Sequence, residues 1–164
     1  MSLVTYFAFV KTLHLLFASL WIGGIILTVV MNRALRRVMP ASEATKSLGV
    51  IGRSIQKTMR HSLCLAIATG LLLLFTRGIA FTALVDPIFY TTPFGAVLLG
   101  KIISVLLILT LLPLHSRLGE KIMYMTVGDG SAYMRVRWDL LLVGWAALGF
   151  TILAVLMGTW LRLS

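Results

Sequence analysis

The sequence carries little charge, and most of the charge it has is positive. Only 12% of its 164 residues are Asp, Glu, Lys or Arg, whereas 59% are hydrophobic. A soluble domain has roughly 25% charged residues, so this chain is too apolar for a fold that is surrounded by water. The composition therefore predicts an integral membrane protein and excludes an ordinary soluble domain.

Cysteine and acidic residues are also scarce. Cys64 is the one cysteine, which excludes an internal disulfide. The chain has 15 Lys and Arg against 5 Asp and Glu. These basic residues flank apolar runs, as they do beside membrane spans, so we expect no nucleic-acid binding.

Several catalytic signatures are missing. The sequence has no G-x-x-x-x-G-K-[ST] loop, no H-E-x-x-H pair and no paired carboxylates within its apolar runs. A nucleotide-driven pump, an intramembrane metalloprotease and a carboxylate-based proton relay are therefore disfavoured.

Long apolar runs are what the sequence has in abundance. A helix crosses the hydrocarbon core of a bilayer with about 20 residues. Four segments meet this length: residues 5–31, 62–84, 94–114 and 140–161. We predict an all-α fold, a polytopic membrane protein in which residues 1–164 form a single domain. Its four transmembrane helices are expected to pack as an up-down bundle.

The basic residues predict the orientation of these spans. They gather in the first and third connections, at Arg33, Arg36, Arg37, Lys46, Arg53, Lys57, Arg60, Arg117, Lys121, Arg135 and Arg137. The connection at residues 85–93 has no Lys or Arg. The positive-inside rule places both basic loops in the cytoplasm and both termini outside, in a bacterial inner membrane. Within residues 32–61, Ser42 and Glu43 are expected to open a short interfacial helix.

Four basic side chains lie inside the predicted spans: Lys11, His14, Arg77 and Lys101. A charge at the centre of a bilayer costs about 2.5–3.5 kcal/mol, so we expect each of these side chains to have a structural or functional role. His14, Arg77 and Lys101 belong to three different spans, and their depths place them at one cavity in the outer half of the membrane. His14 is interpreted as a ligand or a proton-transfer group, with a packing role as the alternative. Arg77 has snorkelling to the interface as its alternative.

Two further histidines lie at the cytoplasmic side. His61 opens the second predicted span and His115 closes the third, so the two imidazoles are expected at one depth. Neutral imidazole binds iron, copper and zinc, and the pair suits the two faces of a porphyrin. The alternative is that both are solvated residues at helix ends. Cys64 follows His61 on the same helix face.

Glycines within the spans are expected to serve helix packing. Gly70, Gly144 and Gly158 lack side chains and allow a neighbouring helix to come close. Trp21 lies two turns beyond His14 on the same helix face.

Several short motifs resemble a known group of membrane proteins. The first span has Lys11-Thr12-Leu13-His14 followed by Trp21-Ile22-Gly23-Gly24. Later segments are Thr69-Gly70-Leu71 and Gly95 to Lys101. These residues resemble motifs of the copper-resistance D (CopD) family and of the HemJ-type protoporphyrinogen oxidases. The resemblance covers about the first 120 residues of the chain.

The resemblance implies a b-type haem held in the bundle, with a functional first-helix histidine and third-helix lysine. The matching positions are His14 and Lys101. The last helix departs from the HemJ-type pattern, because Arg135 to Leu140 lacks its Asn-Glu pair and its proline.

Three functions remain open from the sequence. The first is a haem b protein acting in electron transfer or as a HemJ-like oxidoreductase on a porphyrin, with a quinone or porphyrin as partner. In this haem protein, the candidate ligands are His14, His61 and His115. Arg77 and Lys101 are expected to pair with the haem propionates. The second is CopD-like copper handling. The third is a non-catalytic subunit whose helices contact lipids and other helices in a homo- or hetero-oligomer.

Overall fold

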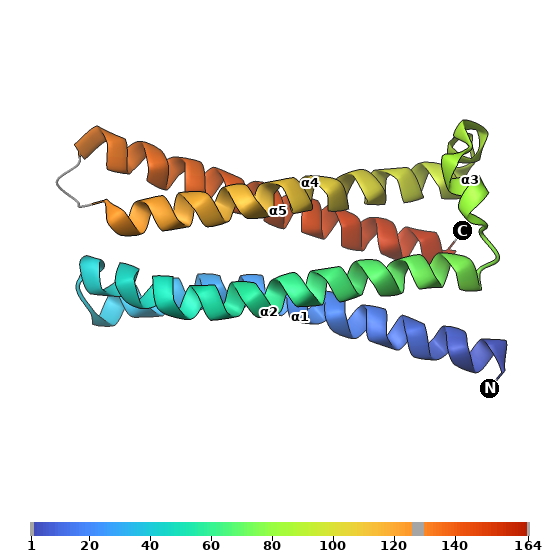
Figure 1. The fold of residues 1–164 in the computed structure, drawn as a ribbon, viewed down its shortest axis with the longest axis horizontal. Helices are drawn as coiled ribbons and strands as arrows, with labels where there is room; N and C mark the ends of the chain where they lie inside the picture. The colour runs from blue at the N-terminus through green and yellow to red at the C-terminus, as the bar shows by residue number, and fades with distance from the viewer. Residues whose placement is uncertain (1, 126–129, 164) are drawn as a thin grey trace. The chain divides into compact units, whose positions relative to one another are not determined.

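The structure is a computed structural model, and it describes residues 2–125 and 130–163. Its elements are α1 (Leu3–Val38), α2 (Ala41–Thr76), α3 (Phe81–Val85), the 3-10 helix η1 (Pro87–Thr91), α4 (Pro93–Tyr124) and α5 (Gly130–Leu163). The chain divides into two compact units, Met1–Asp86 and Pro87–Ser164. The first contains the hairpin of α1 and α2, and the second contains the hairpin of α4 and α5 (Figure 1).

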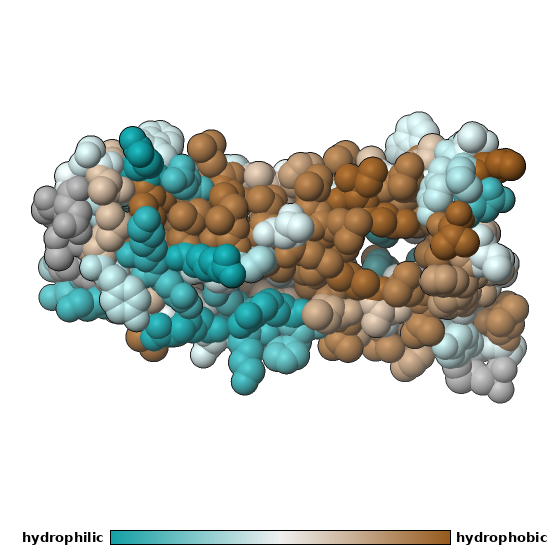
Figure 2. Space-filling model, turned by 45° about the horizontal axis from the view of Figure 1, so that its top comes forward, coloured by the Kyte–Doolittle hydropathy of each residue, from teal (hydrophilic) through white to brown (hydrophobic). Residues whose placement is uncertain are grey.

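Among the described residues, four helices are long and apolar enough to cross a membrane, as predicted. They are Leu3–Val38, Lys46–Thr76, Pro93–Tyr124 and Gly130–Leu161. Many large apolar side chains on them are exposed, for example Val30 at 56% and Leu142 at 63%. Apolar side chains also cover much of the face drawn in Figure 2. An apolar surface of this size suits lipid rather than water, so the all-α membrane fold is confirmed.

The first hairpin turns within two residues. Met39 leaves the helical conformation with φ −144° and ψ 158°, and Pro40 follows it. Proline disfavours helix in the residue before it and is well accepted at a helix start. The predicted short interfacial helix inside a polar connection is therefore wrong. Residues 32–61 instead extend α1 and open α2, because polar residues such as Lys, Arg and Gln are good helix formers.

The end of α2 also differs from the prediction. The second span was expected to reach Leu84, whereas α2 ends at Thr76. Gly78 has a φ of +75°, and the amide of Ile79 donates to Leu74 O at 3.1 Å while that of Gly78 donates to Phe75 O at 3.0 Å. These bonds form a Schellman motif, in which glycine takes the left-handed conformation that ends a helix.

Local capping also sets the start of α4. The Thr92 side chain accepts a hydrogen bond from the amide of Gly95 at 3.0 Å, and Pro93 occupies the first helical position. A Cβ atom at Gly95 would overlap the Phe89 carbonyl oxygen. Glycine at this position therefore lets η1 pack onto the first turn of α4.

Each hairpin has a narrow core of its own. In the first, Val10 and Trp21 are 3% and 4% exposed, and Ala66 and Thr69 of α2 are buried as well. In the second, Ser104 and Ile108 are both 2% exposed. The burial of Trp21 agrees with its expected place on the face of α1 that carries His14.

Candidate functional site

His14 of α1 is held by the backbone of α2. Its Nδ1 lies 2.8 Å from the carbonyl oxygen of Ala66 and 3.3 Å from Oγ1 of Thr69. A carbonyl oxygen only accepts hydrogen bonds, so Nδ1 carries the proton and donates it. In the neutral imidazole, Nε2 then holds the lone pair that is able to bind a metal or take a proton.

Gly70 makes room for this ring. A Cβ atom built at Gly70 would lie 3.2 Å from Cε1 of His14 and 3.5 Å from Nδ1. Any side chain at this position would press against the imidazole. The half-buried His14 ring therefore packs against α2 at Gly70, where no side chain stands between the ring and the helix backbone.

Lys101 has a similar place in the second hairpin. A Cβ atom at Gly158 of α5 would lie 3.2 Å from the Lys101 ammonium nitrogen, Nζ. One residue earlier, Gly100 faces Met157 of α5, whose Cε would lie 2.6 Å from a Cβ at Gly100. The ammonium group therefore reaches across to α5 at the height of Gly158.

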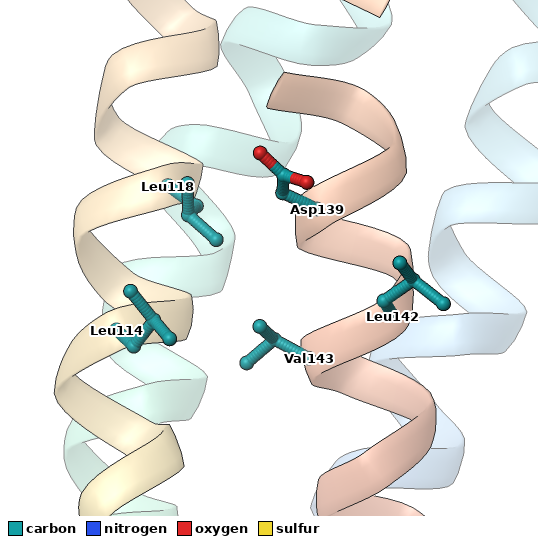
Figure 3. Close-up of a pocket in the computed structure, with 5 residues that line it drawn as sticks. All are labelled: Leu114, Leu118, Asp139, Leu142 and Val143. Carbon is teal, nitrogen blue, oxygen red and sulfur yellow. The ribbon is translucent and has the colours of Figure 1, made fainter. Parts of the chain in front are cut away.

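His115 also lies beside a glycine of α5. A Cβ atom at Gly144 would lie 3.6 Å from Nε2 of His115, an ordinary contact distance. Next to this contact is a pocket of about 340 Å³ between α4 and α5, lined by Leu114, Leu118, Asp139, Leu142 and Val143. Figure 3 shows Leu114 and Val143 pointing toward each other, with Asp139 near Leu118 at one end. The pocket is apolar, with one carboxylate at its rim.

His61 has a less specific environment. It is exposed, and its Nδ1 donates to Lys57 O at 2.7 Å, one turn back on its own helix. It lies well inside α2, which begins at Ala41 rather than near residue 62. Cys64, one turn further on, is exposed too. The pairing of His61 with His115 remains a prediction, since the two residues belong to different units.

Arg77 lies at the C-cap of α2 and is exposed. It is therefore shallower than a span over residues 62–84 would place it. Along α2 it lies about 10 Å beyond Gly70, the residue that contacts His14. The meeting of His14, Arg77 and Lys101 at one cavity stays a prediction, because Lys101 belongs to the second unit.

The glycines were the part of the site that the sequence reasoning missed. Gly70, Gly158 and Gly144 were assigned to general helix packing, yet they lie against His14, Lys101 and His115 respectively. Their partners belong to a different helix and are 29 to 57 residues away in the chain, so sequence spacing gives no direct signal. The sequence did give one signal. Each of these glycines lies in a predicted span that directly follows, along the chain, a span with an ionisable residue.

The donor atoms of the described residues suit a haem iron better than a bare metal ion. Within residues 2–125 and 130–163, no group of three or more His, Cys, Asp or Glu side chains is placed to hold a metal ion. A bare ion such as copper or zinc needs several protein ligands. Haem iron takes most of its ligands from the porphyrin and needs one or two from the protein. An imidazole whose Nδ1–H is fixed by a carbonyl, as in His14, fits that requirement.

Comparison with known proteins gives no relative: no family model, no curated protein and no solved structure matches the chain.

Proposed function

We propose that this protein binds haem b in the membrane and has a redox role, and that His14 would supply a ligand to the iron. The observation that carries the proposal is the hydrogen bond from His14 Nδ1 to Ala66 O at 2.8 Å. It fixes the tautomer and the ring orientation, and it raises the basicity of Nε2 as a ligand. The resemblance of the motifs around His14 to haem-binding HemJ-type proteins supports the same assignment.

The chain's own residues have defined parts in this function. His14 presents Nε2, while Ala66 and Thr69 hold the ring and Gly70 leaves space for it. A pairing of Lys101, in the second hairpin, with a carboxylate such as a propionate stays a prediction from the sequence. When bound, a haem supplies one-electron chemistry, whereas the protein sets the ligand, the polarity and the access. The physiological reaction is then electron transfer or the oxidation of a porphyrinogen.

Copper handling has weaker support in the first hairpin. Met59 of α2 is placed against Gly24, about 16 Å along the helix from Gly70. Its sulfur is too far from His14 to share a metal ion with it. Cys64 is exposed, on the side of α2 away from α1. Haem binding therefore fits the donors better.

Visible absorption of the purified protein tests the proposal. We expect a Soret band that shifts on reduction with dithionite, and we expect it to be lost in His14→Ala. His61→Ala is the matched control, because His61 also donates through Nδ1 to a carbonyl but is exposed. Absence of haem from the wild-type protein after expression with ample haem supply would reject the function. Full haem content in His14→Ala would reject the ligand.

The orientation belongs to the same proposal. We place the turn at Met39 and Pro40 in the cytoplasm of a bacterial cell, because the flanking helix ends carry the basic residues. Reporter fusions at the C-terminus test this: a reporter that is active only outside the cytoplasm is expected to be active. Activity of a cytoplasm-specific reporter at that end would reverse the orientation.

A further inference from the structure

Four basic side chains form a stripe along one face of α2. Lys46, Arg53, Lys57 and Arg60 are separated by seven, four and three residues, the spacing that brings helical side chains onto one face. All four are exposed. We call this set the basic stripe.

The basic stripe faces away from α1. The buried residues of α2, among them Met59, Ser62 and Ala66, lie on the opposite side of the helix. Met59 contacts Gly24, and Ala66 accepts the hydrogen bond of His14, so that side is the one packed on α1. Between Asn32 and His61 the sequence has a single acidic residue, Glu43, and so the stripe remains strongly positive.

The length of α2 places part of the stripe at the membrane surface. Its apolar part, residues 62–76, is about 22 Å long, shorter than the ~30 Å hydrocarbon core. For α2 to span the bilayer, Arg60 and Lys57 must lie close to the edge of the hydrocarbon on the side of the α1–α2 turn. Arg53 then lies at the depth of the headgroups.

The part of α2 that lies inward of the basic stripe is apolar. Leu71 and Phe75 follow Arg53 and Lys57 by 18 residues, or five helical turns, and so lie on the same face of α2. They are 47% and 49% exposed. This face therefore offers cations at the edge of the hydrocarbon and an apolar surface further inward, a combination that matches an anionic headgroup with its acyl chains.

We propose that the first hairpin binds an anionic phospholipid at this place. The phosphate group pairs with Arg53, Lys57 and Arg60, and the acyl chains run inward along the exposed apolar residues of the same face of α2, Leu71 and Phe75. The charge of the stripe selects an anionic lipid over a zwitterionic one. This site is separate from His14 and does not depend on the presence of haem.

Cys64 provides a probe for the test. It is the chain's one cysteine, it is exposed, and it lies one turn inward from Arg60 on the striped side of α2. A small fluorophore on Cys64 of the full chain is measured in bilayers containing either phosphatidylglycerol or phosphatidylcholine with brominated acyl chains. Quenching by each lipid gives the relative association. We expect phosphatidylglycerol to associate about fivefold or more tightly.

Variants that remove the same number of charges from different places show which residues cause the preference for phosphatidylglycerol. In Arg53→Gln/Lys57→Gln/Arg60→Gln the preference is expected to fall to about one. The control Arg33→Gln/Arg36→Gln/Arg37→Gln removes the same charge from the end of α1 and is expected to keep at least half of it. Arg53→Lys/Arg60→Lys keeps the charge, so it retains the preference even where the glutamine variant is unstable. Equal quenching by the two lipids in the wild type, or equal loss in both glutamine variants, would overturn the site.

Discussion

The two hairpins place ionisable side chains in the membrane by different means. In the first, His14 lies on Gly70 and also donates a hydrogen bond to Ala66 O. In the second, His115 lies against Gly144 and makes no hydrogen bond within the part of the chain that the structure describes. A glycine creates space, whereas a hydrogen bond fixes the tautomer and the direction of the ring. The first hairpin is thus the better prepared for a metal ligand.

The strongest test of this difference compares the two histidines. If His14 is the ligand that we propose, His14→Ala is expected to lower haem retention at least about tenfold, because it removes an imidazole held in place by a second residue. His115→Ala is expected to change it less than about twofold. Both variants are measured by the Soret absorbance per protein after identical purification. Loss of haem in His115→Ala with retention in His14→Ala would reverse the roles of the two hairpins.

The next test concerns stability and does not involve haem. Gly24→Ala is expected to destabilise the protein by about 1–3 kcal/mol, since its Cβ overlaps Cγ of Met59, an atom close to the backbone. Gly100→Ala meets the flexible end of Met157, with Cε 2.6 Å away, so a rotamer change relieves most of the clash. Thermal unfolding followed by circular dichroism in detergent gives both values.

Gly149→Ala is the control for this pair. Nothing lies within 4 Å of a Cβ at Gly149, and alanine is a better helix former than glycine. We therefore expect no loss of stability there. A larger loss in Gly100→Ala than in Gly24→Ala would show that Met157 is the more rigidly held side chain.

The sequence predicted the four membrane-spanning helices because long apolar runs are a local property of composition, but it did not predict α3 or η1. It failed at helix ends, although Pro40 and Gly78 were visible signals for the turn and for the end of α2. Because residues 32–61 are polar, they were predicted to form a connecting loop, whereas all but the turn at Met39 and Pro40 are helical. The pairing of His14 with Ala66 was out of reach, since it depends on the register between two helices. Periodicity identifies the face that packs but not its partner residue.

A smaller effect on haem binding is expected from adding a methyl group at the glycines that contact His14 and Lys101. Gly70→Ala puts a Cβ atom 3.2 Å from Cε1 of His14, and the ring cannot retreat without stretching its bond to Ala66 O. We expect haem to bind about three- to tenfold more weakly, in line with the loss of second-shell support. Gly158→Ala instead meets the end of the flexible Lys101 side chain, which can shift and keeps its charge, so haem binding is expected to change less than about twofold. Haem titration into the apo-protein measures both, and equal effects would mean that His14 is not held rigidly.

The smallest effect is expected from the hydroxyl group beside His14. The Thr69 hydroxyl donates to Leu65 O at 2.7 Å, and its oxygen is a second acceptor for His14 Nδ1 at 3.3 Å. Thr69→Val removes this acceptor but leaves the shorter bond to Ala66 O. Haem affinity should therefore fall less than about threefold, because a long hydrogen bond contributes little.

Thr28 of α1 is the matched control for Thr69. It is half-buried, and its hydroxyl donates to Gly24 O at 2.8 Å, also one turn back along its helix. Thr28→Val likewise replaces a hydroxyl that is bonded to its own helix, but it lies about 21 Å along α1 from His14. Haem titration of the two variants isolates the contribution of the His14 contact. If Thr69→Val weakens haem binding as much as His14→Ala does, the ring is oriented by the hydroxyl rather than by the carbonyl. The feature that distinguishes the first hairpin would then be a side chain and not its backbone.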